Sequence, residues 1–174
     1  MAQESYSCVM TSARRDPRPA IPPVDPVRKF EHTHGSLNKI ALDVAASVRA
    51  AQQGPTPETW SQLRARLKAL HDELLVHFAD EEEALFPFVR AVVPKKTAAV
   101  EGLEAAHDTI CGSIVRMVHL AAGEPEVAKL AALHARFETA YAKHSAEEAK
   151  LFDGLDGLLD EAQRHELAER LRGL

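Results

Sequence analysis

The sequence predicts an all-α protein folded as an up-down-up-down four-helix bundle. Three observations lead to this prediction. The chain has 174 residues, which suits one domain, because two independent cores would be cramped in that length. Ala, Leu, Glu, Lys and Arg, which favour helices, fill the stretches between prolines. Apolar residues recur with a helical period in four long segments, and short links containing Gly and Pro separate these segments.

Residues 1 to 24 are predicted to form an irregular N-terminal arm, and residues 25 to 174 to form the bundle domain. The arm has four prolines between positions 17 and 23, and its apolar residues show no period. It therefore cannot supply a hydrophobic core of its own.

The first helix is predicted to begin at Pro26, with Asp25 as its N-cap. It should end near Gln53, because Gly54 and Pro55 follow. Proline fits the first turn of a helix, where its missing N–H is not needed, and glycine favours the position after the last turn.

The second helix is predicted to begin at Pro57, with Thr56 as its N-cap. Its pattern continues to Phe86, where Pro87 should end it, because a proline inside a helix removes a hydrogen bond and clashes with the preceding turn. The second helix therefore has the same kind of start and stop residues as the first.

The third and fourth helices are delimited in the same way. Thr97 is predicted to cap the third helix, which Gly123 ends. Pro125 should lie in the first turn of the fourth helix, which Gly154 ends. A short fifth helix follows, preceded by an aspartate and a glutamine, at positions 160 and 163, with the spacing of a capping box.

The net charge and the cysteine content limit which binding partners and which cellular compartment are expected. The formal net charge is -5, and no run of Lys and Arg exceeds two residues, so neither nucleic acid nor a membrane surface is an expected partner. Cys8 and Cys111 are too few for a disulfide framework, which favours a reducing, cytoplasmic setting. No export signal or membrane span is expected, because no 18 apolar residues run together.

Each apolar stripe is interrupted by a histidine, and two stripes also carry a glutamate. At 100° per residue, six polar side chains face the interior of the bundle. They are His34 on the first helix, His77 and Glu81 on the second, His107 on the third, and His144 and Glu148 on the fourth. In an antiparallel bundle the four histidines also lie at one height, about 14 Å from the same end.

Two segments of the chain that contain these residues are similar in sequence. The segment from His77 to Phe86 resembles that from His144 to Phe152 with one residue deleted. The first and second helical hairpins are therefore interpreted as two copies of one half-site.

The six side chains are interpreted as metal ligands. A lone buried histidine is more often satisfied by hydrogen bonds, and a lone glutamate on a helix usually faces water. Six converging groups differ, because burying them without a cation would cost several kcal/mol per unpaired charge. They exceed what one tetrahedral zinc needs and suit two iron ions bridged by Glu81 and Glu148, with two nitrogens each.

The remaining histidines are predicted to play no part in binding metal. They are His32, which points away from the core, His71 and His119, which lie about 120° from the ligand lines, His134 at the edge of its stripe, and His165 in the fifth helix.

The H-x-x-x-E motif occurs twice, as His77/Glu81 and His144/Glu148, with one histidine on each of the other two helices. This pattern resembles the hemerythrin family, specifically the bacterial HHE cation-binding domains, over roughly residues 26 to 153. The resemblance implies a four-helix bundle with two non-haem irons, and the six residues above match the family's ligands by position. Its members handle dioxygen or nitric oxide, sense oxygen or iron, or repair iron-sulfur clusters.

The chain departs from the oxygen-carrying hemerythrins at one position. Those proteins have a fifth histidine one turn away on the third helix, where this chain has Leu103 and Cys111. With an oxo or hydroxo bridge, each iron would be five-coordinate and open to an exogenous ligand. Sensing, scavenging or redox reaction of O2, peroxide or NO is therefore expected rather than simple oxygen carriage, and whether the protein is an enzyme stays open.

Cys111 and Tyr141 are predicted to line a pocket above the metal plane. Cys111 is expected to pack as a small thiol and Tyr141 as a core residue, neither ligating metal. The other predicted lining residues are Leu37, Leu74, Ile110 and Ile114 above the plane, and Phe30, Leu85, Phe86, Leu103 and Phe152 below it.

Three other functions remain open. The first is a ferritin-like di-iron oxidase, because Glu31 and Glu104 each precede a ligand histidine by three residues, although the two other histidines would then be surplus. The second is an interaction module held by zinc or another structural cation, and the third is a metal-free helical adaptor. The oligomeric state, monomer or homodimer, is not predicted.

Overall fold

The computed structural model describes the backbone of residues 26–172 and the side chains of residues 34–172 other than residue 156. Every regular element in this range is helical. The elements are α1 (Pro26–Gln53), α2 (Pro57–Ala79), the π-helical turn η1 (Asp80–Leu85), α3 (Phe86–Val92), the 3-10 turn η2 (Pro94–Lys96), α4 (Thr97–Ala122), α5 (Val127–Asp156) and α6 (Glu161–Arg172). The predicted arm of residues 1 to 24 lies outside the described residues.

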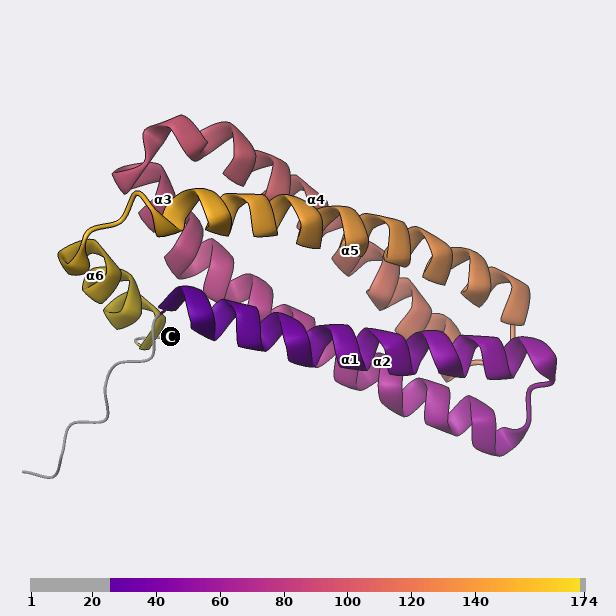
Figure 1. The fold of residues 1–174 in the computed structure, drawn as a ribbon. Helices are drawn as coiled ribbons and strands as arrows, with labels where there is room; N and C mark the ends of the chain where they lie inside the picture. Colours follow the sequence, from indigo (N-terminus) through magenta and orange to yellow (C-terminus); the bar gives the residue numbers. More distant parts are fainter. Residues whose placement is uncertain (1–25, 173–174) are drawn as a thin grey trace, which may run out of the picture.

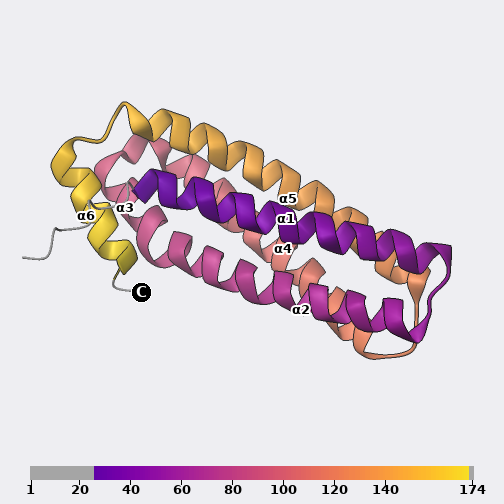
Figure 2. The ribbon, with the colours of Figure 1, turned by 60° about the horizontal axis from the view of Figure 1, so that its bottom comes forward.

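The long helices α1, α2, α4 and α5 form the predicted up-down-up-down bundle (Figure 1). α1 and α4 each pack against both α2 and α5, so the four helices form a closed square, as Figure 2 also shows. The short α6 crosses one end of the bundle, against η1 and α1. Every long helix therefore presents one face to a shared interior.

Two predicted helix starts are confirmed by their hydrogen bonds. At the start of α2, the Thr59 N–H donates to the Thr56 hydroxyl (3.2 Å), and the Thr56 N–H donates to Thr59 Oγ1 (2.8 Å). Before α6, the Gln163 N–H donates to Asp160 Oδ1 (2.8 Å), and the Asp160 N–H donates to Gln163 Oε1 (3.0 Å). Both are reciprocal caps that satisfy N–H groups at a helix start.

The prediction that the second helix ends at Phe86 is wrong. The chain passes through the π-helical turn η1 and continues as α3 to Val92. The Phe86 N–H donates to the Glu81 carbonyl, five residues back rather than four. Pro87 lies in the first turn of α3, where a proline is tolerated, instead of ending the helix.

Three other predicted helix boundaries are displaced. Thr97 is the first residue of α4 rather than its cap, because η2 leads directly into the helix. Pro125 precedes α5, which begins at Val127. Gly154 lies inside α5 rather than after it. The Lys96 side chain packs over Gly154, where a Cβ would lie 2.5 Å from its Nζ, the flexible end of that side chain.

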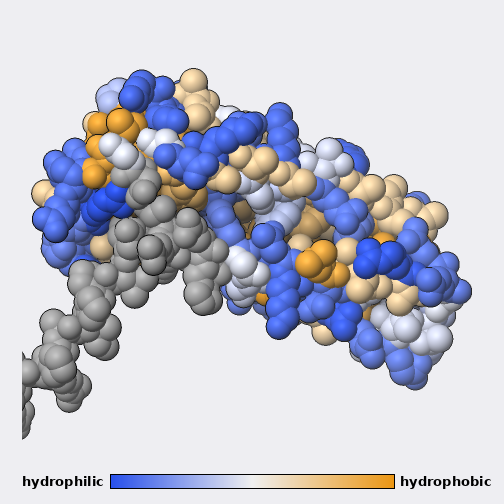
Figure 3. All heavy atoms as spheres, in the orientation of Figure 1, coloured by the Kyte–Doolittle hydropathy of each residue, from blue (hydrophilic) through white to orange (hydrophobic). Residues whose placement is uncertain are grey.

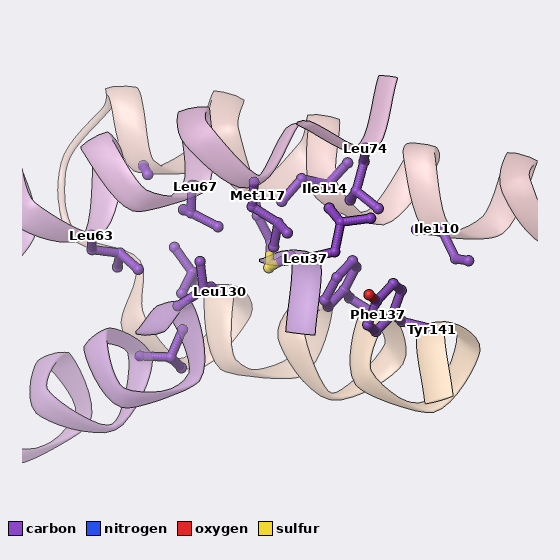
Figure 4. Packing of buried hydrophobic residues seen from close by; sticks show 14 of the residues in the cluster. Leu37, Leu63, Leu67, Leu74, Ile110, Ile114, Met117, Leu130, Phe137 and Tyr141 are labelled. Atoms are coloured by element: carbon purple, nitrogen blue, oxygen red, sulfur yellow. The ribbon is translucent and has the colours of Figure 1, made fainter. Parts of the chain in front are cut away.

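Two hydrophobic clusters fill the bundle. The first runs along the square of long helices and includes Leu37, Leu63, Leu67, Leu74, Ile110, Ile114, Met117, Phe137 and Tyr141, which point toward one another in Figure 4. The second fills the end near α3 and α6 and includes Leu85, Phe86, Leu103, Leu151 and Phe152. The residues predicted above and below the metal plane fall into the first and second clusters respectively, apart from Phe30, whose side chain lies outside the description.

The surface offers no continuous apolar belt among the residues described. The face in Figure 3 is largely hydrophilic, with scattered apolar side chains. Exposed large apolar residues are Leu42, Leu75, Val76, Val115 and Leu158, and single exposed apolar residues are ordinary in soluble folds. Within the described range, no helix is both long and apolar enough to cross a bilayer.

The packing predicts different costs for two leucines of α2. Leu67 is fully buried and Leu75 is 48% exposed. Leu67→Ala is expected to lower the free energy of unfolding of the metal-free protein by about 2–5 kcal/mol, because it leaves a cavity. Leu75→Ala should change it by less than about 0.5 kcal/mol. Urea unfolding measures both, and equal effects would contradict the assignment of Leu67 to the core.

Candidate metal centre

Six polar side chains converge between the two hydrophobic clusters. They are His34 from α1, His77 from α2, Glu81 from η1, His107 from α4, and His144 and Glu148 from α5. Five of them are buried, and the side chain of His34 is 19% exposed. The structure thus brings together every residue that the sequence predicts as a ligand.

The first donor group consists of His34, His77, Glu81 and Glu148, which offer one ligand atom each within 4.8 Å of one another. His34 Nε2 lies 3.1 Å from His77 Nε2 and 2.9 Å from Glu148 Oε2. His77 Nε2 lies 2.7 Å from Glu81 Oε1, because four residues of helix place the two side chains on one face.

The second donor group consists of Glu81, His107 and His144. His107 Nε2 lies 2.9 Å from Glu81 Oε2 and 2.8 Å from His144 Nε2. Phe78 of α2 packs against this group, since its ring stacks on the His107 ring with centroids 3.8 Å apart.

Glu81 is the residue that the two groups share. Its Oε1 faces the first group and its Oε2 the second. Glu148 was expected to bridge as well, but in this structure it belongs to the first group alone. Its Oε2 turns toward His34 and lies 3.7 Å from His144 Nδ1.

Burial and proximity set the charge state of the centre. Burial raises the pKa of a carboxyl group, but at Glu81 the His107 and His77 imidazoles outweigh it and hold the pKa below its usual range. Burial, together with the charge of Glu81, raises the pKa of Glu148 to about 8 against the opposing effect of His34. Burial lowers the pKa of His144 to about 4. Without a cation, one carboxyl therefore stays protonated at neutral pH.

The donor atoms fit a metal centre. Two ligand atoms at right angles around an ion with bonds of about 2.1 Å lie about 3 Å apart, which matches the separations of 2.7–3.1 Å found here. None of the four oxygens of Glu81 and Glu148 accepts a hydrogen bond of ordinary geometry from the described part of the chain. Buried carboxylate oxygens left in this way are costly unless a cation neutralises them.

Comparison with known families agrees with this geometry. The family model described as the hemerythrin HHE cation-binding domain matches residues 25–155, which is more than half of the chain and includes all six converging residues. The chain belongs to the hemerythrin HHE family. The family predicted from the doubled motif is confirmed. A comparison with curated proteins finds no match.

Of the two glutamates that a ferritin-like site would use, the one that the structure describes lies outside the donor groups. Glu104, one of the two glutamates of that alternative, pairs with Arg90 at the partly exposed outer side of α4. It is absent from both donor groups. The side chain of Glu31, the other glutamate, lies outside the description.

The two predicted pocket residues pack beside the centre without entering it. Cys111 is half-buried against the first hydrophobic cluster, and its sulfur belongs to neither donor group. Burial raises the pKa of its thiol. The Tyr141 hydroxyl donates to Asn38 Oδ1 (3.1 Å), and its ring stacks on Phe137. Burial raises the pKa of Tyr141 to about 12.

The other described histidines stay apart from the donor groups. His119 and His165 are exposed, and His71 Nδ1 lies 3.3 Å from Asp72 Oδ1. His134 is only 5% exposed, so it is a buried residue rather than one at the edge of its stripe. The side chain of His32 lies outside the description.

Sequence reasoning missed Phe78, whose ring stacks on His107, and a carboxylate that contacts the same imidazole. Glu82 Oε1 lies 2.6 Å from His107 Nδ1. The available signal was the extra residue in the segment His77–Phe86, which the structure accommodates as η1. That signal indicates an irregular turn after Glu81, but not the direction in which the next side chain points.

Cation binding at pH 7 is expected to release at least about one proton per chain, because the pKa of Glu148 is raised to about 8 in the metal-free centre and a coordinating carboxyl must be ionised. The release should decline as pH rises through 8, where the free carboxyl ionises by itself. Calorimetric titration with a divalent cation in two buffers of different ionisation enthalpy measures it. Release that is absent at pH 7 would contradict this charge state.

Proposed function

We propose that the protein holds two non-haem irons through His34, His77, Glu81, His107, His144 and Glu148, and that it binds or reacts with O2, peroxide or NO. The observation that carries the proposal is the pair of donor groups joined by one buried carboxylate, Glu81. A single ion cannot use both groups at once, whereas two ions sharing a carboxylate can.

Iron is favoured by the chemistry of the donors. Four imidazoles with two carboxylates form a mixed nitrogen and oxygen set, which suits iron better than thiolate-rich or all-oxygen sites would. A structural zinc needs four donors in a closed tetrahedron. The six donors of this centre exceed that need, and both carboxylates lie inside the bundle rather than at its surface.

The donor groups are unequal, which bears on where a small ligand would bind. The first group has four residues and the second has three, and neither Leu103 nor Cys111 adds a donor to the second. A centre with fewer protein donors keeps more positions for an external ligand. When bound, a pair of irons would supply one-electron redox chemistry and open positions for O2, peroxide or NO.

His144 of the second donor group lies beside a surface groove. A groove of about 310 Å³ runs between α4 and α5 and is lined by small residues, including Gly102, Ala106 and Ala140, together with His144. A small uncharged ligand could follow this route to the edge of the His144 ring. The two hydrophobic clusters pack on either side of the donor atoms, and the His34 side chain of the first group is 19% exposed.

These features favour sensing, scavenging or redox reaction over simple oxygen carriage. Carriage by the oxygen-binding hemerythrins rests on a fifth histidine that this chain lacks at Leu103 and Cys111. A cytoplasmic setting forms part of the same proposal and rests on the chain having only two cysteines.

Protein purified without air is expected to contain about two irons per chain. Glu81→Ala should lose both, because Glu81 serves both donor groups, while Glu148→Ala should keep more iron, because Glu148 serves one. Glu104→Ala is the matched control on the outer side of α4 and should keep the full content. Metal analysis measures the content, and optical spectra before and after adding O2 or NO test the reactivity. Tightly held zinc, or one iron per chain, would contradict the proposal.

A further inference from the structure

Glu82 lies outside both donor groups and yet contacts one of their members. Its Oε1 is 2.6 Å from His107 Nδ1, a length typical of a charge-assisted hydrogen bond. On the opposite edge of the same ring, Nε2 faces Glu81 and His144. The imidazole of His107 is therefore held between a carboxylate behind it and the second donor group in front of it.

The π-helical turn η1 accompanies this contact. The segment His77–Phe86 is one residue longer than its counterpart His144–Phe152, and the extra residue is absorbed in η1 while α5 stays regular. In the α5 copy, Ala149 follows the ligand glutamate, so no carboxylate occupies the position equivalent to Glu82. The two half-sites thus differ in the number of their donor residues, and also in whether a second carboxylate follows the ligand glutamate.

The chemistry of the contact fixes which nitrogen of His107 faces Glu82 with a proton. An ionised carboxylate only accepts hydrogen bonds, so Nδ1 of His107 must carry the proton that it donates to Glu82. In the neutral ring, Nε2 then keeps its lone pair for a metal ion. The Phe78 ring, stacked at 3.8 Å with an interplanar angle of 14°, holds the plane of the imidazole.

We propose that Glu82 is a positioning residue of the metal centre: through the hydrogen bond to His107 Nδ1, it orients Nε2 toward the ion of the second donor group and strengthens the binding of that ion. The proposal rests on the metal centre proposed above. The second group is where such help matters most, because it has three protein donors against four in the first.

The test is an anaerobic titration of Fe2+ into the metal-free full chain, with a chelator competing for the iron, which gives the stoichiometry and the affinity of each iron. Glu82→Ala is expected to weaken one of the two irons by about 10–100-fold and leave the other near its original affinity. Glu82→Gln should restore much of the loss, because the amide oxygen accepts the same hydrogen bond from Nδ1. Glu83→Ala, the exposed neighbour, is the matched control and should bind as the unaltered protein does.

The outcomes separate this proposal from the proposed function. If the unaltered chain binds two irons and Glu82→Ala binds both equally well, Glu82 does not position His107, while the di-iron centre stands. Equal weakening of both irons, or a Glu82→Gln variant no better than Glu82→Ala, would also overturn the positioning role. If the unaltered chain binds fewer than two irons, the proposed function fails first.

Discussion

The fold depends on how it neutralises two carboxylates, and finds partners for four imidazoles, in the middle of a hydrophobic bundle. Glu81 and Glu148 are fully buried, and their oxygens accept no ordinary hydrogen bond within the described residues. Protonation offers one partial solution, since burial raises the pKa of Glu148 to about 8. Cations offer the complete one, because they neutralise both carboxylates and use the lone pairs of the imidazoles.

This constraint explains how the bundle is divided. Two hydrophobic clusters pack on either side of the polar layer, and each long helix contributes at least one member to that layer. Because the six converging side chains come from α1, α2 with η1, α4 and α5, an ion bound by them would tie all four helices together. Binding and folding free energy are then linked, as expected for a site that does not exist in the unfolded chain.

Much of this arrangement follows from the sequence. A helical period places His34, His77, His107 and His144 on inward faces, and Gly and Pro links set the helices antiparallel, so their common level could be predicted. The path of the chain after Glu81 could not, because a π-helical turn differs from an α-helix by one hydrogen-bond register, and propensity does not encode that difference. For the same reason, the contact of Glu82 with His107 and the passage of the helix through Pro87 emerged only from the structure.

The grouping of the ligands was also beyond the sequence. Periodicity shows which residues face inward, but the pairing of His34 with His77 and of His107 with His144 depends on side-chain rotamers and on which helices are neighbours. The same holds for Glu148, whose carboxylate turns toward His34 instead of standing between the groups. Spacing alone treats the two H-x-x-x-E motifs as equivalent, whereas the structure does not.

The central claim is that two cations complete this fold. The most direct measurement is the thermal unfolding midpoint of the metal-free protein as Fe2+ is added without air. The account predicts that the midpoint rises steeply up to about two equivalents and only gradually beyond. A midpoint that does not respond to Fe2+, or that levels off after one equivalent, would contradict it.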